Sequence, residues 1–274
     1  MSDANEAEVQ AMARKVSKEV PAAGAPGRRA ILIVKYCRGR LGGSAWELTV
    51  VQRARAAGRE VIVIDGDEVS KTMRTYYPTG SPGAALVPDG SDVAAFKELM
   101  LEQMTLMAAD GKARVVDVSG GSRDLDDVLA ELDLPVFCQD YGIDLLVVAM
   151  LGENREDFNH AVKAIEAGFV RPENLLLVLN HGVLGKKNPE AAFLPITDDQ
   201  RYKDLVACGA RVMHMPNLPV LDKMRAARVD GYATAASAKM PDGSFQPIWQ
   251  NMAKRWLTTM EQEFADAGIT DLLP

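Results

Sequence analysis

The chain has 274 residues, of which 47% are hydrophobic and 25% are charged. These proportions are typical of a globular protein with a sizeable core, and they exclude a disordered, collagen-like or disulfide-stapled chain. The formal net charge of −7 provides no overall positive field that would attract nucleic acid or anionic lipid. At about 150 residues per domain, the length predicts one large domain or two small ones.

The first 27 residues are polar and rich in alanine, and they end in the sequence PAAGAPG. We expect residues 1–27 to form a flexible or peripheral arm and residues 28–274 to form a single domain, because no repeat or long linker interrupts them. The three cysteines, Cys37, Cys138 and Cys208, are odd in number and far apart, which offers neither a disulfide framework nor a zinc knuckle. We therefore expect them to be buried reduced thiols. No secretory signal or bilayer-spanning apolar run is present, so we expect a cytoplasmic protein without membrane attachment.

Short aliphatic runs alternate with helical patterns through the rest of the chain. The runs are nearly continuous in apolar residues, which is typical of strands buried on both faces of a parallel sheet. The predicted strands are residues 30–36, 60–65, 113–119, 145–151, 174–180 and 211–216. Helices are predicted at residues 45–57, from the N-cap Ser91 to residue 109, at 122–132 and at 154–167. This order predicts an α/β fold with a doubly wound, mostly parallel sheet flanked by helices.

Ligands of such sheets bind at the carboxyl ends of the strands, so the residues that follow each strand form the candidate site. After the first predicted strand comes CRGRLGGS, residues 37–44, which leads into a helix. Small residues let backbone amides approach an anion, and the helix N-terminus adds partial positive charge. Arg38 and Arg40 supply cationic donors that suit phosphate oxygens. This segment therefore predicts a phosphate-binding turn.

The motifs resemble, in the same order, those of the ParA/MinD family of deviant P-loop ATPases, over almost the whole chain after residue 28. The family's phosphate loop, K-G-G-x-G-K-[ST], falls on RGRLGGS at residues 38–44. GREVIVIDGD and VVDVSGG resemble the two acidic strand ends, and LLVLN and MPNLP resemble the segments beside adenine. The resemblance implies a P-loop NTPase-like fold that binds ATP or ADP with Mg²⁺.

The resemblance also implies a role for each matched residue. Asp67 would position the attacking water, and Arg38 would reach the partner's nucleotide in a dimer, which makes these two the candidate catalytic residues. The candidate nucleotide-binding residues are Gly39, Arg40, Leu41, Gly42, Gly43, Ser44, Asn180, Pro216 and Asn217, and the candidate metal ligands are Ser44, Asp65 and Asp117. An aspartate at a strand end also often caps the next turn, so a structural role stays open for the three aspartates.

The loop departs from the family pattern at three positions. Arg38 replaces the signature lysine, Arg40 replaces the second glycine, and Gly43 replaces the phosphate-binding lysine. Losing a lysine on the β- and γ-phosphates removes a charge-assisted contact worth about 1.5–3 kcal/mol. It also leaves transition-state charge less well neutralised. We therefore expect nucleotide binding with weak or absent hydrolysis.

By resemblance, the protein would be a homodimeric switch for positioning, partition or transfer of a cargo such as plasmid DNA or a protein assembly. The acidic net charge does not support DNA binding by the chain itself. The alternative is a non-catalytic pseudo-ATPase scaffold that acts through protein–protein interaction, which Gly43 and the bulky Arg40 favour. A ligase or synthetase built on a related nucleotide fold is a third option, for which no substrate-binding residues are identifiable.

Two further features receive structural interpretations. His160, His181 and His214 are scattered and have no second ligand at metal spacing, so we expect no chemical task for them. A stripe of large apolar side chains on the last helical pattern predicts packing against the sheet. Its members are Trp249, Met252, Trp256, Met260 and Phe264.

Overall fold

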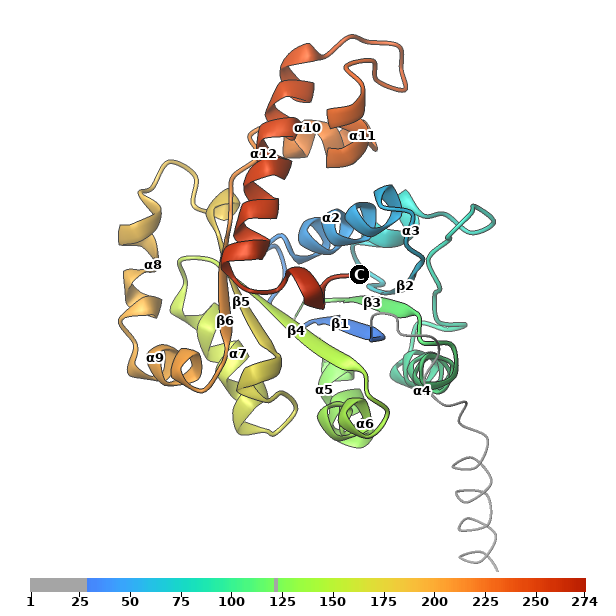
Figure 1. Ribbon diagram of the computed structural model, residues 1–274, viewed down its shortest axis with the longest axis vertical. Coiled ribbons are helices and arrows are strands. Elements are labelled where there is room, and N and C mark those ends of the chain that lie inside the picture. Colours follow the sequence, from blue (N-terminus) through green and yellow to red (C-terminus); the bar gives the residue numbers. More distant parts are fainter. Residues whose placement is uncertain (1–28, 121–122) are drawn as a thin grey trace, which may run out of the picture.

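The computed structural model describes residues 29–120 and 123–274, so the expected arm at residues 1–27 lies outside it (Figure 1). Six strands form one sheet in the order β2-β3-β1-β4-β5-β6, and all neighbours are parallel. The strands are β1 Ile31–Lys35, β2 Val61–Gly66, β3 Ala113–Val118, β4 Asp144–Leu151, β5 Leu175–Asn180 and β6 Arg211–Met215. The chain fills one side of β1 and then the other, which confirms the doubly wound α/β fold.

Helices cover both faces of this sheet (Figure 1). On one face lie α2 Gly43–Ala56, α3 Thr72–Tyr76, α10 Leu221–Ala226, α11 Gly231–Ala236 and α12 Pro247–Asp266. On the other lie α4 Val93–Asp110, α5 Arg123–Leu132, α6 Leu134–Asp140, α7 Arg155–Glu166, α8 Pro189–Thr197 and α9 Gln200–Ala207. Three short 3-10 helices are η1 Pro172–Asn174, η2 His181–Val183 and η3 Thr270–Leu272.

The predicted strands all form, each within one residue of its expected ends. The helices differ more from their expected starts. α2 begins at Gly43, inside the glycine-rich turn, and Asp92 rather than Ser91 caps α4, because its Oδ1 accepts a hydrogen bond from Ala95 N. The helix expected at 154–167 forms as α7, and Asn154 caps it by accepting a hydrogen bond from Glu156 N. The expected start at Ser122 lies outside the described residues.

The continuous apolar runs are explained by two cores, one on each face of the sheet. Leu32 and Val34 of β1 point into one core, and Ile31 and Ile33 point into the other. No helix in residues 29–120 or 123–274 is both long and apolar enough to cross a membrane.

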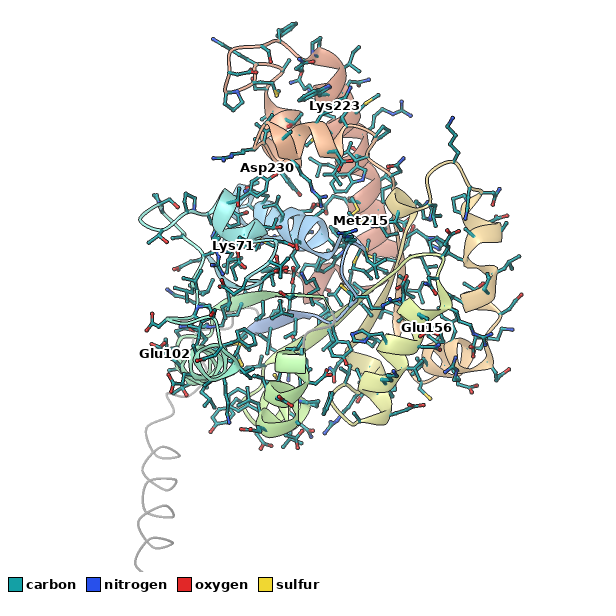
Figure 2. All side chains as sticks on the ribbon, turned by 180° about the vertical axis from the view of Figure 1, so that it is seen from behind. Lys71, Glu102, Glu156, Met215, Lys223 and Asp230 are labelled. Atoms are coloured by element: carbon teal, nitrogen blue, oxygen red, sulfur yellow. The ribbon has the colours of Figure 1, made fainter. Side chains whose placement is uncertain are left out.

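The C-terminal helix α12 packs against the sheet, as its apolar stripe predicts. Trp256, Met260 and Phe264 are buried in the same core as α2, and the Phe264 ring meets that of Trp46 edge-on at 6.3 Å. The N-terminal part of α12 projects beyond the sheet together with α10 and α11 (Figure 1). From behind, Lys223 and Asp230 mark this projection, far from Glu102 on α4 (Figure 2).

Five polar residues of the strands are buried: Arg114 near the amino end of β3, and four at the opposite end of the sheet. Lys35, Asp65, Asp117 and Asn180 are buried, and each lies at or next to the carboxyl end of its strand. Burying polar groups is costly unless they are paired, so this end of the sheet is where the functional site is to be sought.

Candidate functional site

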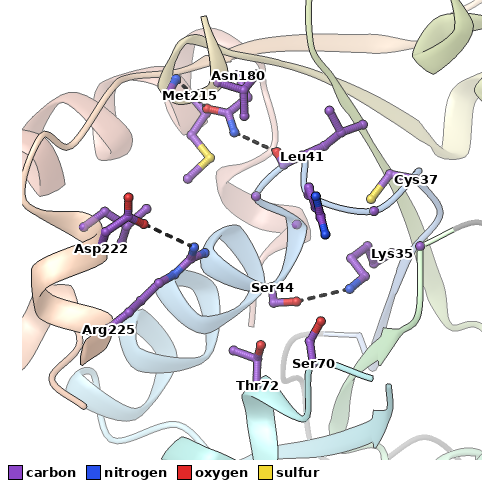
Figure 3. Close-up of a pocket in the computed structure, with 18 of the residues that line it drawn as sticks. Lys35, Cys37, Leu41, Ser44, Ser70, Thr72, Asn180, Met215, Asp222 and Arg225 are labelled. Carbon is purple, nitrogen blue, oxygen red and sulfur yellow. Dashed lines mark hydrogen bonds and ion pairs between the residues drawn. The ribbon is translucent and has the colours of Figure 1, made fainter. Parts of the chain in front are cut away.

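A cavity of about 970 Å³ opens at the carboxyl ends of the strands (Figure 3). It is lined by the turn at residues 38–44, by Asp67, by Asn180 and by residues 215–219. Segments that are far apart in the sequence, and that the family resemblance singled out, therefore surround one space. Asp65 and Asp117 do not line the cavity; both are fully buried beside it.

The glycine-rich turn is shaped by two residues with left-handed backbone. Arg40 has φ 67° and Gly42 has φ 87°. A Cβ on Gly42 would lie 2.6 Å from Asn180 Nδ2, so only glycine fits there. The carbonyl of Gly42 accepts the first helical hydrogen bonds, from Ala45 N and Trp46 N. The N–H groups ahead of these two, at the very start of a helix, have no partner within it, and they form its positive end. The turn thus provides an anion cradle.

Lys35, the last residue of β1, lies at the floor of this cradle and was missed by the sequence analysis. Lys35 is 5% exposed, and its Nζ donates to Ser44 Oγ at 3.2 Å (Figure 3) and forms an ion pair with Asp117 Oδ1. The aliphatic part of Lys35 crosses Gly43 so closely that a Cβ on residue 43 would overlap Lys35 Cδ. An ammonium group therefore stands beneath the phosphate turn, although the turn itself has no lysine.

The available signal for Lys35 was a charged residue inside the apolar run ILIVKY, two positions before the turn. In sequence alone, that residue is also consistent with an exposed strand end.

Two buried carboxyl groups accompany Lys35. Asp117 Oδ1 also accepts from Ser44 Oγ at 3.2 Å, whereas Asp117 Oδ2 and both oxygens of Glu47 have no hydrogen-bond partner among the described residues. Burial, reinforced by the charge of Asp117, raises the pKa of Glu47 well above its ordinary range. Burial opposes the charge on Lys35, but the adjacent Glu47 and Asp117 carboxyls outweigh it and raise the pKa of Lys35. Lys35 consequently stays charged and offsets the charge of Asp117.

Asp65 has a structural role at the end of β2. Its Oδ1 accepts from Asp67 N at 3.0 Å and its Oδ2 from Arg74 N at 2.7 Å. Burial nevertheless raises the pKa of Asp65 above its ordinary value. With both oxygens engaged by backbone, the side chain fixes the turn after β2.

Asp67 reaches the cavity but is also tied to its surroundings. Its Oδ1 accepts from Val69 N at 2.9 Å, Ser70 N at 2.8 Å and Ser119 Oγ at 2.8 Å. Burial works against ionisation, yet these hydrogen bonds lower the pKa of Asp67 below its ordinary value. Asp67 therefore remains an anion that joins the loop after β2 to the loop after β3.

The two arginines of the turn line the cavity at its exposed rim. Arg38 and Arg40 are exposed, and Arg38 Nη1 contacts Asp157 Oδ1 at 3.2 Å. The cation at the floor of the cradle is therefore Lys35 and not an arginine of the turn.

Asn180 joins the turn to the end of β5. Its Nδ2 donates to the Leu41 carbonyl at 2.7 Å, and its Oδ1 accepts from Gly182 N at 2.8 Å (Figure 3). Pro216 and Asn217 form the opposite wall, where the Pro216 carbonyl accepts a hydrogen bond from Trp256 Nε1 at 2.8 Å. Trp256 thus belongs to both the core and the cavity wall.

The histidines and cysteines form no metal centre. His181 Nε2 and His214 Nδ1 are 3.0 Å apart, which corrects the expectation that the histidines are scattered. Even so, residues 29–120 and 123–274 contain no group of three His, Cys, Asp or Glu that could hold a metal ion. Cys208 is exposed, contrary to expectation, whereas Cys37 and Cys138 are buried free thiols.

The Mg²⁺ site implied by the family resemblance does not fit this geometry. Two of its three ligands, Ser44 and Asp117, are bridged by the ammonium of Lys35. The third, Asp65, has both oxygens engaged by backbone N–H groups. A divalent ion would have to share the position of a lysine ammonium.

No protein-family model matches this chain, and no curated protein matches it. Among solved structures, MinD of Aquifex aeolicus is 14% identical, with 84% of this chain and 97% of that chain covered and a TM-score of 0.47. McdA of Cyanothece, solved in an ATP complex, is 8% identical, with 86% and 98% covered and a TM-score of 0.49. FtsY of Mycoplasma mycoides is 10% identical over 55% of this chain and about half, 52%, of that chain, with a TM-score of 0.37. With sequence identities and TM-scores this low, the similarity to these structures does not indicate a function for this chain.

Proposed function

We propose that the protein binds ATP or ADP in the cavity at the strand ends and acts as a ParA/MinD-like switch with weak or no hydrolysis. The observation that carries this proposal is the buried Lys35 ammonium beneath the glycine-rich turn at the N-terminus of α2. A fixed cation, unpaired backbone amides and a helix dipole converge there, and this combination suits a phosphate group.

The phosphate end of the nucleotide would lie against residues 39–44. Gly43 and Ser44 face the cavity at the first turn of α2, and Lys35 lies behind them. Asp67 and Asp222 are the two carboxylates among the described residues that line the cavity, and three hydrogen bonds hold Asp67 Oδ1. The balance of charge at the turn therefore favours an anion.

The base would lie toward the opposite wall. This wall presents the apolar side chains of Met215 and Leu218, the ring of Pro216 and the amide of Asn217. A cavity of about 970 Å³ is large enough for a whole nucleotide, since small-molecule pockets measure about 300–1,000 Å³. Asn180 contributes by holding Leu41 in place, because its amide oxygen and nitrogen already bond to the backbone.

Weak hydrolysis follows from the same contacts. Positioning water would be the task of Asp67, but Val69, Ser70 and Ser119 hold its Oδ1, so that only Oδ2 would be left to orient a water. Lys35 is shared with Asp117 and is therefore less able to follow charge that develops on a leaving phosphate. A switch needs a difference between its ATP and ADP states, which homodimerisation through the exposed Arg38 would provide. Its partner would be a protein or another cargo.

The proposal is tested by titrating the full chain with fluorescent ATP and ADP analogues and following their anisotropy. We expect saturable binding, competed by unlabelled ATP and ADP and only weakly by adenosine, because phosphate supplies the main contacts. Absence of binding at millimolar nucleotide would contradict the proposal.

The scaffold alternative is favoured by two exposed apolar side chains next to the start of α12. Phe245 and Ile248 are 72% and 67% exposed in the projecting part of the molecule. If the protein acts only as a scaffold, substitutions at Phe245 and Ile248 would abolish its cellular role, whereas Lys35→Met would leave that role intact.

A further inference from the structure

We propose that the Lys35 ammonium takes the place of a divalent metal ion, so that the protein binds its nucleotide without Mg²⁺. This inference rests on the proposed nucleotide site and adds a chemical property to it. The family resemblance implies that Ser44 and Asp117 bind a metal ion, whereas in the structure both contact Lys35.

The oxygens that would hold the metal are already joined by a cation. Ser44 Oγ and Asp117 Oδ1 are 3.2 Å apart, and Lys35 Nζ contacts both of them. Figure 3 shows the contact between Lys35 and Ser44. An ammonium group has three N–H donors, and two of them are used in these contacts. Because Lys35 also lines the cavity, its third donor is available to a phosphate oxygen.

Lys35 is held firmly in this position. It is the last residue of β1, paired in register with Val148 of β4, so its backbone is part of the sheet. Its side chain is buried and passes over Gly43 on the way to Ser44. The ammonium therefore cannot leave without breaking its contact with the buried Asp117.

A divalent ion lacks ligands at this place. Mg²⁺ requires near-octahedral oxygen coordination at about 2.0–2.1 Å. The hydroxyl and carboxylate that remain are those bound to Lys35, and Asp65 is occupied by Asp67 N and Arg74 N. A second cation beside the ammonium would also be repelled by it.

Gly43 supports the same conclusion, because the lysine at residue 35 and the glycine at residue 43 depend on each other sterically. Any side chain at residue 43 would overlap Lys35 Cδ, including a lysine at the position the family pattern gives it. Moving the lysine from the helix to the strand thus requires glycine in the helix. It also brings the ammonium onto Ser44 and Asp117, where it serves as the counter-charge for the carboxylate.

The direct test compares the affinity of the wild-type chain for ATP and for ADP in EDTA and in millimolar Mg²⁺, by anisotropy or calorimetry. We expect the two dissociation constants for each nucleotide to agree within about threefold. Binding that appears only with Mg²⁺, or improves more than about tenfold with it, would overturn this inference and leave the nucleotide site standing. Absence of binding in both buffers would overturn the nucleotide site itself.

Variants separate the role of Lys35 from general stability. In Lys35→Met, Asp117 and Glu47 lose their cation, so we expect binding in EDTA to weaken about tenfold or more and Mg²⁺ to restore part of it. The matched control is Lys187→Met, since Lys187 pairs with Glu153 on the surface and should bind like wild type in both buffers. If Lys35→Met retains metal-independent, wild-type affinity, the inference is wrong.

A second variant guards against loss of folding in Lys35→Met. In Lys35→Ala/Gly43→Lys, the lysine returns to the helix, and truncation of residue 35 removes the atoms that a Cβ on residue 43 would overlap. We expect this variant to bind nucleotide more tightly with Mg²⁺ than in EDTA, because Ser44 and Asp117 are released. Metal-independent binding by the double variant would contradict the role assigned to Lys35.

Discussion

Lys35 and Gly43 compete for the same space: Lys35 Cδ lies where a Cβ on residue 43 would have to be. We therefore expect Gly43→Ala to lower the free energy of unfolding by about 1–3 kcal/mol through overpacking. In the Lys35→Ala background there is space for the added methyl group, so Gly43→Ala should lower the free energy of unfolding much less. Denaturant unfolding of the two single variants and the double variant measures this coupling.

If Gly43→Ala lowers the free energy of unfolding equally in the wild-type and the Lys35→Ala backgrounds, Lys35 does not cross residue 43. Gly58→Ala is a useful comparison, because a Cβ on Gly58 meets no atom within 4 Å but has to adopt φ 71°. The loss of stability in Gly58→Ala reports backbone strain alone, so it should be the same with and without Lys35→Ala.

Glu47 should make stability depend on pH. Burial and the charge of Asp117 raise the pKa of this carboxyl well above its ordinary value of 4.5. Because the folded pKa exceeds the unfolded one, the native state loses stability as the pH rises from about 4 toward the folded pKa. Glu47→Gln removes this loss, so its Tm should exceed that of wild type near neutral pH and equal it at about pH 4. Thermal melts across this range test the sign, and a gain that persists undiminished at acidic pH would contradict it.

Asp67 should stabilise the cavity rim through three hydrogen bonds to one oxygen. Asp67→Ala leaves Ser119 Oγ and the amides of Val69 and Ser70 without this acceptor. We expect a loss of about 1–3 kcal/mol in the free energy of unfolding. The exposed Asp89, in the loop before α4, is the matched control, and Asp89→Ala should change stability by less than about 0.5 kcal/mol. Similar losses in both variants would argue against the network.

Arg38 should matter for association and little for folding. Its ion pair with Asp157 is half exposed on the arginine side, so Arg38→Ala should cost less than about 1 kcal/mol of stability. If Arg38 contacts a partner's nucleotide, the variant should bind ATP like wild type but form less dimer with ATP. Sedimentation with and without ATP measures the dimer, and an unchanged ATP-dependent dimer fraction would refute this role.

The strands and the phosphate turn could be predicted because their signals are local. Each strand contains a nearly continuous apolar run, and residues 37–44 combine small residues with a strand-to-helix transition. Helix starts were less certain, since Ser91 and Asp92 are both good N-caps and only the backbone geometry selects Asp92. The short helices α3, α6 and α8 to α11 were not predicted, because a few turns carry too little periodicity to stand out.

The chemistry of the cavity floor could not be predicted, because it depends on where side chains lie across the sheet. Lys35 and Gly43 are eight positions apart, and nothing in their spacing shows that one crosses the other. The contact between His181 and His214 likewise depends on β5 and β6 being neighbours. Asn180 was expected beside adenine, and the structure places it on the cavity wall with its amide bound to Leu41 and Gly182.

Calorimetric titration of ATP into the wild-type chain and into Lys35→Met tests most directly whether Lys35 makes this cavity a nucleotide site. We expect saturable binding at one site per chain for wild type. For Lys35→Met in EDTA, with its fold checked by circular dichroism, we expect affinity at least about tenfold weaker. No heat of binding to wild type at millimolar ATP, or equal affinities for the two proteins, would contradict the account.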